Sequence, residues 1–205
     1  MTLSGNNTYG GTTTVSAGSL IVNGNQSTAT GVLSVASGAT LGGSGIIGGA
    51  TTISGILAPG NSIGTLTVAN DVTWNSGGSW VFELGAAGPS ILSPGTSDLL
   101  AITDGNDFLK GTGGPFTFDF AGTGDFGWYK LVDWAGGSTT FDVLDFTGVN
   151  LSSGVYTSEF SIQDNALYVN VVPEPSTYAL LALAASLVGV YSVRRRNSMR
   201  SRSGR

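Results

Sequence analysis

The 205-residue sequence contains no cysteine and no histidine. The absence of cysteine excludes disulfides, thiolate metal sites and a cysteine nucleophile, and it is compatible with a reducing or an oxidising compartment. The absence of histidine excludes Ser–His–Asp catalysis, imidazole bases and histidine-ligated zinc. Because the acidic residues are also best interpreted as a solvated face and turns, we expect no catalytic residue, no metal site and no cofactor, and a protein that is not an enzyme.

Charge is scarce and unevenly placed. Residues 1–70 contain no Asp, Glu, Lys or Arg, and the first charged side chain is Asp71. All 13 acidic residues lie between Asp71 and Glu174, where Lys110 and Lys130 are the only bases. The other bases are arginines that follow residue 193. A body this acidic does not bind nucleic acid by neutralising phosphates, so nucleic acid is not an expected partner.

An uncharged apolar run, 178–193, precedes the arginines. It predicts one C-terminal transmembrane helix about 24 Å long, slightly shorter than the hydrocarbon core of about 30 Å. Tyrosines at the boundaries and snorkelling arginines compensate for the difference. We expect Arg194, Arg195 and Arg196 to stop membrane transfer and stay cytoplasmic, which places the preceding body outside. Residues 197–205 are expected to be a disordered basic tail.

Pro173, Glu174 and Pro175 stand just before this run. The two prolines end the preceding strand and keep the backbone extended and exposed. In order, the Pro-Glu-Pro triplet, a polar pair, a short apolar helix and an arginine cluster over 172–196 resemble the PEP-CTERM sorting signal of Gram-negative bacteria. The resemblance implies that an exosortase, a membrane-embedded processing enzyme, recognises Pro173, Glu174 and Pro175. It also implies a transient inner-membrane anchor, followed by transfer to the cell surface or the extracellular space. An ordinary C-terminal anchor is the alternative.

The N-terminal residues Met1–Asn7 have neither the basic segment nor the apolar stretch of a signal peptide. Since export of such a C-terminus normally requires one, we expect the sequence to be the C-terminal part of a longer precursor, or to have a misplaced start. Any enzymatic activity would then belong to the upstream part.

Residues 1–70 alternate short apolar patches with Gly, Ser, Thr and Asn. Glycine supplies the positive φ angles that tight turns need. Leu20 and Leu33 are 13 residues apart, and Leu41, Ile47 and Ile53 recur every six. Short strands at close intervals predict a parallel β-helix whose turns stack apolar residues inward, with Thr, Ser and Asn ladders between turns. A β-sandwich is the alternative. The expected strands are 19–22, 32–35, 39–41, 46–47, 51–53, 55–57 and 65–68.

Four strings in this region carry a second resemblance. They are LSGNNTYGGTTTV at 3–15, GSLIVNG at 18–24, SGATLGGSGIIGG at 37–49 and GILAPGNSIGTLTV at 55–68. They resemble the autotransporter-associated β-strand repeat. The resemblance implies a right-handed parallel β-helix of the passenger type, forming an extracellular stalk.

From residue 71 to 171, acids and aromatics appear together, and the apolar–polar alternation becomes longer. We expect an acidic β-rich cap over the open end of the β-helix, built either from wider coils or as a small sandwich. The expected strands are 80–84, 116–120, 128–132, 141–144, 160–162 and 167–171.

The acids of this region include candidates for chemistry. Glu83, Asp133 and Glu159 are candidates for a glycosidase pair, but a solvated face that aids solubility is the simpler interpretation. Asp104–Asp107 offers oxygen ligands for Ca²⁺, but it lacks the full loop pattern, and an Asp-Gly turn is simpler.

The sequence therefore predicts an all-β, exported structural protein of the cell surface or extracellular matrix. The alternative is a surface adhesin or carbohydrate-binding module, with exopolysaccharide as a candidate partner. In that case exposed aromatics such as Trp74, Trp128 and Trp134 would stack on sugars.

Overall fold

A computed structural model describes residues 1–103, 105–122, 124–151 and 156–174. The chain divides into two units, Met1–Val172 and Pro173–Arg205. Expectations for 175–205, which include the apolar run 178–193, lie outside the described residues. The fold below is that of the first unit.

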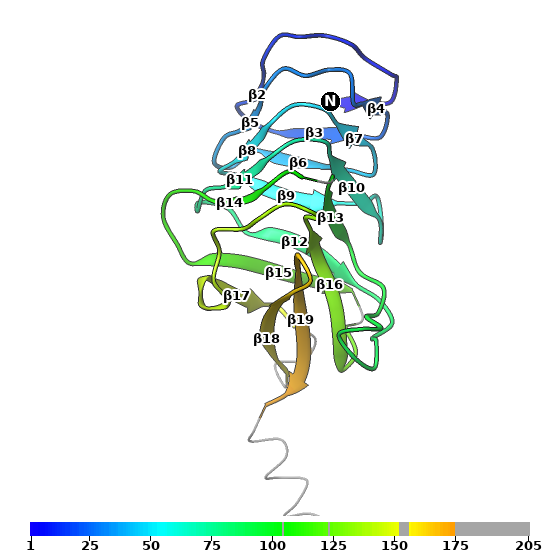
Figure 1. The fold of residues 1–205 in the computed structure, drawn as a ribbon, viewed down its shortest axis with the longest axis vertical. Helices are drawn as coiled ribbons and strands as arrows, with labels where there is room; N and C mark the ends of the chain where they lie inside the picture. Colours follow the sequence, from blue (N-terminus) through cyan, green and yellow to red (C-terminus); the bar gives the residue numbers. More distant parts are fainter. Residues whose placement is uncertain (104, 123, 152–155, 175–205) are drawn as a thin grey trace, which may run out of the picture. The chain divides into compact units, whose positions relative to one another are not determined.

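The chain of the first unit winds in successive turns, and parallel pairing joins equivalent strands of successive turns within each of its sheets (Figure 1). A turn has three faces. The first face carries two sheets. The first consists of β1 (Thr2–Leu3), β3 (Ser19–Val22), β6 (Thr40–Gly43) and β9 (Ile56–Pro59), and the second of β12 (Trp80–Leu84), β15 (Phe116–Gly122) and β17 (Phe146–Val149). The second face carries β2 (Thr13–Val15), β5 (Leu33–Val35), β8 (Thr51–Ile53), β11 (Val72–Trp74) and β14 (Phe108–Lys110). The third face carries β4 (Asn25–Gln26), β7 (Ile46–Ile47), β10 (Thr65–Val68), β13 (Leu99–Ile102) and β16 (Gly127–Asp133).

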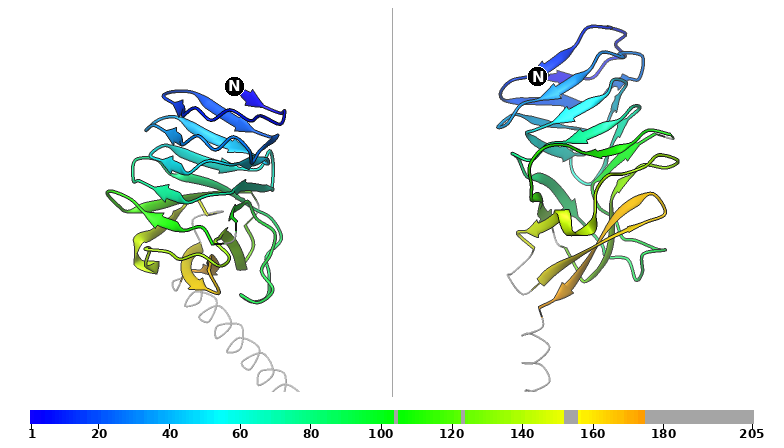
Figure 2. Two further views of the ribbon diagram at one scale, coloured as in Figure 1. Left: turned by 45° about the horizontal axis from the view of Figure 1, so that its top comes forward. Right: turned by 60° about the vertical axis from the view of Figure 1, so that its left-hand side comes forward.

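A hairpin of opposite direction ends the third face. β19 (Ala166–Pro173) pairs antiparallel with β16, and β18 (Tyr156–Gln163) lies beside β19. Figure 2 shows this hairpin at the end of the unit away from the N-terminus. The all-β class and the parallel sheets predicted from the sequence are confirmed.

The length of a turn differs from the spacing seen in the sequence. Leu20 and Leu33, 13 residues apart, lie on different faces, whereas Leu20 is opposite Leu41 and Leu41 is opposite Leu57. Contacts between successive turns, such as Ser44 with Asn23, join residues 21 apart. The interval of six marks the step from one face to the next, because Leu41, Ile47 and Ile53 belong to β6, β7 and β8.

Alternation decides which side chains fill the coil. In β10, Leu66 and Val68 are buried and Thr65 and Thr67 face outward, because successive side chains of a strand point to opposite sides. The first turns are filled by Leu, Val and Ile. From β11 onward the turns lengthen: Ser138 bonds to Asp107 over 31 residues and Thr112 to Asn75 over 37. The wider interior is filled by aromatic rings.

Parallel pairing continues across the predicted boundary at residue 70, because β10 pairs with β13 and β11 pairs with β8. The acidic region thus consists of wider turns of the same coil rather than of a separate sandwich. One predicted strand, 141–144, is wrong. Residues Val143–Asp145 form a 3-10 helix, which the Asp142 carboxylate caps by accepting a hydrogen bond from Leu144 N.

Candidate functional site

The predicted sorting motif begins where the last strand of the coil ends. Leu167, Val169 and Val171 of β19 are buried, and the strand is paired with β16 up to Val171. Pro173 is the last residue of β19, and Glu174 follows it. Proline cannot donate to a strand ladder, which explains the end of the strand. The last strand of the coil thus includes Pro173, the first residue of the predicted motif.

The rest of the predicted signal lies outside the described residues: Pro175, the apolar run 178–193, and Arg194, Arg195 and Arg196. Within the part of the chain that the structure describes, no helix has the length and apolar character needed to cross a membrane.

The three acids considered for chemistry lie on three different strands, and each has a local role. The backbone N of Glu83, on β12, donates to Asp98. The carboxylate of Asp133, on β16, pairs with Lys130 Nζ at 3.0 Å. The carboxylate of Glu159, on β18, accepts a hydrogen bond from Asn170 Nδ2 at 3.3 Å. The described residues contain no cluster of three or more acids that could hold a metal ion.

The proposed Ca²⁺ loop is a corner of the coil. Asp104 is outside the described residues, and Gly105 has a φ of 81°, as a tight turn requires. The Asp107 carboxylate accepts hydrogen bonds from Ser138 N at 2.8 Å and Ser138 Oγ at 2.9 Å. Asp107 N in turn donates to the Asp71 carboxylate at 2.9 Å. Asp71 and Asp107 therefore occupy equivalent corners, and each carboxylate binds the backbone of the next turn.

Asp98 carries a buried carboxyl group that the sequence analysis did not single out. Its side chain is only 2% exposed. One oxygen accepts from Gly64 N at 3.0 Å and the other from Glu83 N at 2.7 Å. Burial raises the pKa of this carboxyl to about 6. Both oxygens bind backbone amides, so Asp98 links the corner after β9 to β12. The partners are distant in sequence, and no local pattern marks them.

Two of the three tryptophans that were predicted to stack on sugars are buried. Trp74 is 0% and Trp134 1% exposed, so the prediction that these two are exposed is wrong. Trp128 is half-buried. Trp74 stacks on Trp80 with ring centroids 3.8 Å apart and an interplanar angle of 12°. The physical reason is the width of the coil, because only large rings fill the longer turns at the density of a protein interior.

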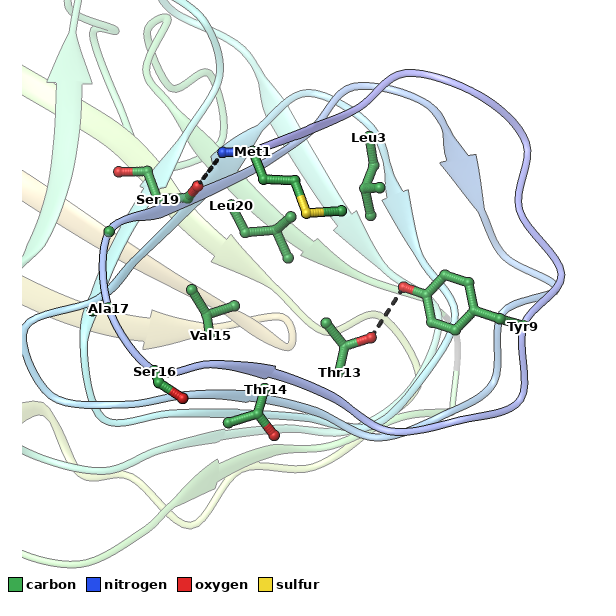
Figure 3. Close-up of a pocket in the computed structure, with 11 residues that line it drawn as sticks. Met1, Leu3, Tyr9, Thr13, Thr14, Val15, Ser16, Ala17, Ser19 and Leu20 are labelled. Carbon is green, nitrogen blue, oxygen red and sulfur yellow. Dashed lines mark hydrogen bonds between the residues drawn. The ribbon is translucent and has the colours of Figure 1, made fainter.

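A hollow of about 530 Å³ opens at the N-terminal end of the coil (Figure 3). Leu3, Val15 and Leu20 contribute apolar side chains to it. Tyr9 lies at its side, where its hydroxyl accepts a hydrogen bond from Thr13 Oγ1 at 3.2 Å. The Met1 amine donates to Ser19 O at 2.8 Å. No charged side chain lines this hollow, in keeping with the absence of charged side chains from 1–70.

Comparison with known proteins supports both resemblances. A 61-residue stretch of this chain is 54% identical to the adhesin BmaC autotransporter of Brucella suis biovar 1 (strain 1330). The stretch is 29% of this chain and 2% of that protein, so the chain spans a small part of its relative. Residues 171–196 match the model of the PEP-CTERM protein-sorting motif, which indicates an exported surface protein that an exosortase-type system sorts. The chain therefore carries a PEP-CTERM sorting motif at residues 171–196 and, ahead of it, a β-coil unit with sequence similarity to an autotransporter adhesin.

Proposed function

We propose that this protein is a non-enzymatic structural component of the bacterial cell surface or extracellular matrix. The observation that carries the proposal is the sorting motif at 171–196, which begins within the last three residues of β19, the last strand of the coil. In this proposal, the coil of Met1–Val172 is the lasting product, a right-handed β-helical stalk.

The acidic turns close the stalk in this proposal. Their carboxylates serve structural contacts, as Asp71 and Asp107 do at the corners. Acidic side chains on the outer surface keep the exported unit soluble.

The segment 172–196 is proposed as a temporary anchor. An exosortase-type enzyme would recognise Pro173, Glu174 and Pro175, while the run 178–193 spans the inner membrane and Arg194, Arg195 and Arg196 stay cytoplasmic. The match to the sorting-motif model and the sequence order support this proposal.

Processing in the native cell tests the sorting proposal. The gene is expressed from its own locus in strains with and without the exosortase-type enzyme, and the mass of the surface protein is measured. We expect a product that has lost its C-terminal segment only in the strain that has the enzyme. Glu174→Ala should abolish the shortening, whereas Glu159→Ala, a matched change at an exposed glutamate of β18, should leave it unchanged. Equal processing of both variants, or a full-length product in both strains, would rule the proposal out.

An adhesive role is the second candidate, because the similar protein from Brucella suis is named an adhesin. Since Trp74 and Trp134 are buried, a sugar-stacking surface would use other rings, such as Phe126, which is 52% exposed. Phe126 packs edge-on against Tyr156 with ring centroids 4.7 Å apart. A glycan array with residues 1–172 separates the two roles. Binding that Phe126→Ala removes would favour adhesion, and uniform absence of binding would leave the structural role.

A further inference from the structure

The outer face of the third sheet carries a tryptophan near the end of the coil. This sheet ends in β16, β19 and β18, which lie side by side in that order (Figure 1). On β16, Tyr129 and Leu131 are buried, whereas Trp128 and Lys130 are half-buried. Because successive side chains of a strand point to opposite sides, Trp128 and Lys130 lie on the outer face.

The core does not use the ring of Trp128. Trp74, Trp80 and Trp134 are at most 1% exposed and contact other rings of the interior. Among the described residues, no aromatic ring packs against Trp128. Its indole N–H has no partner there either, and it is not one of the buried indole N–H groups that lack a partner. Part of a large ring, with a polar donor at its edge, is therefore open to solvent.

Two polar side chains follow the Trp128 ring, one on each of the next strands. Asn170 of β19 is the partner of Trp128 in the β16–β19 register. Trp128 N and O both bond to Gly88 on the other side of β16, so the side chains of Trp128 and Asn170 belong to the closer kind of antiparallel pair. Asn170 Nδ2 donates to the Glu159 carboxylate of β18 at 3.3 Å. The ring, the amide and the carboxylate form a row across three strands, about 10 Å long.

The charges and the backbone of this face favour a neutral ligand that is not a peptide strand. Lys130 Nζ pairs with the Asp133 carboxylate at 3.0 Å, so its charge is balanced within the face. Glu159 is exposed, and the group that donates to it is a neutral amide. An anionic ligand would therefore meet negative charge at the row. β16 and β19 have paired strands on both sides, so a peptide cannot add to either of them as a further strand.

A groove of about 320 Å³ borders Lys130. Leu99 of β13 faces outward like Lys130, because its neighbour Leu100 is buried. The groove combines apolar side chains with hydroxyl groups, from Ile63, Pro94 and Leu99 and from Thr65, Thr96 and Ser97. This mixture suits a ligand that has both apolar surface and hydroxyls, and the groove gives room for a further unit of a chain-like ligand.

We propose that the row of Trp128, Asn170 and Glu159 binds a neutral polysaccharide of hexopyranose units. The C–H face of one sugar ring packs on Trp128. Neighbouring hydroxyls donate to the Glu159 carboxylate and bond to the Asn170 amide. The chain continues past Lys130 into the groove. This inference rests on the adhesive role, the second candidate function above, and names its site and its ligand class.

Calorimetric titration of residues 1–172, a compact unit with its own core, tests the site. The neutral probes are cellohexaose, laminarihexaose and mannohexaose, and the acidic probe is a galacturonic acid hexamer. We expect binding of at least one neutral probe and none of the acidic one. Trp128→Ala should raise the dissociation constant about tenfold or more. Asn170→Ala and Glu159→Gln should each raise it about threefold. Thr67→Ala, at an outward position of β10 in the same sheet, should leave it unchanged.

Fluorescence of the same fragment gives a second readout. Because the other three tryptophans are at most 1% exposed, quenching by acrylamide reports mainly on Trp128. A bound neutral hexasaccharide should reduce the quenching, and Trp128→Phe should remove both the quenching and its change on binding. Trp128→Phe keeps a ring, so it should bind more tightly than Trp128→Ala, and circular dichroism verifies that each variant is folded.

The outcomes separate this site from the adhesive role on which it rests. Binding that Phe126→Ala removes and Trp128→Ala leaves intact would keep the adhesive role and overturn the site. Stronger binding of the galacturonic acid hexamer than of the neutral probes would overturn the ligand class. Absence of binding by every probe would overturn the site and the adhesive role together, while the structural role would stand.

Discussion

The first four turns and the last turns of the coil pair their strands in the same way, but they differ in charge and in the side chains that fill their interiors. Residues 1–70 use no charge and fill a narrow interior with Leu, Val and Ile. The turns after Asp71 are wider and are filled by rings such as Trp74, Trp80 and Phe118. In the narrow turns, contacts between corners use neutral groups, as in Asn61 Nδ2 to Asn23 Oδ1 at 3.1 Å. In the wide turns carboxylates take that place, as in Asp107.

The comparison shows that the length of a turn and the size of its core side chains change together. A longer turn encloses more volume, and an interior filled by Leu alone would leave cavities. Longer turns also create corners whose amides need acceptors, and a carboxylate can serve two donors at once. Charge therefore enters the sequence where the coil widens.

The largest effect is expected from removing core side chains. Trp74→Ala should cost about 4 kcal/mol of unfolding free energy, because the ring is 0% exposed and stacks on Trp80. Leu41→Ala, its counterpart in the narrow turns, should cost about 3 kcal/mol. Denaturant unfolding of residues 1–172 measures both. Trp74→Phe is the control: it keeps a ring and removes a buried indole N–H that has no partner, so its cost should stay below about 1.5 kcal/mol. A Trp74→Ala cost below that of Trp74→Phe would contradict this account of the wide core.

Close backbone packing between turns should be equally sensitive in both regions. A Cβ on Gly45 would lie 2.3 Å from Gly24 O, and one on Gly137 would lie 1.8 Å from Asn106 O. Gly45→Ala and Gly137→Ala should each cost about 2 kcal/mol in thermal or denaturant unfolding. Gly10→Ala, with nothing within 4 Å of the added atom, should be nearly neutral. If all three variants behaved alike, the turns would not be packed as closely as described.

The buried carboxyl at the start of the wide turns should make stability depend on pH. The pKa of Asp98 is raised by burial from 3.8 to about 6, so the folded state holds this proton more tightly than the unfolded state. The unfolding free energy should therefore fall by about 1–3 kcal/mol as pH rises from about 4 to about 6. Asp98→Asn should flatten this slope relative to the wild type in pH-dependent denaturant unfolding. An unchanged slope in the variant would exclude Asp98 as its source.

The smallest effect on stability is expected from removing single contacts between corners, where charged and neutral contacts should differ in their dependence on salt. Lys110 and Asp145 form an ion pair in the wide turns, with side chains 35% and 18% exposed. Lys110→Met should cost less than about 1 kcal/mol, and salt should reduce the cost. Asn23→Ala removes the acceptor of Ser44 N and Asn61 Nδ2, and its cost of about 1 kcal/mol should not depend on salt. Thermal unfolding of both variants in low and high salt measures this difference. Equal salt dependence of the two costs would contradict the prediction.

Local patterns in the sequence were enough to predict many strands. Three strands were predicted at their observed bounds: Ser19–Val22, Thr65–Val68 and Trp80–Leu84. In these segments apolar and polar residues alternate, or a short apolar segment ends at a glycine-rich turn. The strand Leu99–Ile102 was missed, since its continuous apolar run hides the alternation. The strand predicted at 141–144 failed because the Asp142 carboxylate competes for the backbone.

Properties that depend on stacking were harder to predict. The 13-residue spacing of Leu20 and Leu33 was misleading, because turns of unequal length leave no fixed period. Asp98 was missed because its donors, Gly64 and Glu83, meet only in the folded coil. The motif of Pro173 and Glu174 was recognisable because it is contiguous in the sequence.

The claim that the narrow and wide regions are turns of one coil can be tested by a single unfolding experiment. All four tryptophans, Trp74, Trp80, Trp128 and Trp134, lie in the wide turns, so their fluorescence reports on that region alone. Far-ultraviolet circular dichroism reports on both regions. In denaturant unfolding of residues 1–172, we expect the two signals to change together in one cooperative transition. Two separate transitions, with the fluorescence change at a different denaturant concentration, would contradict the claim.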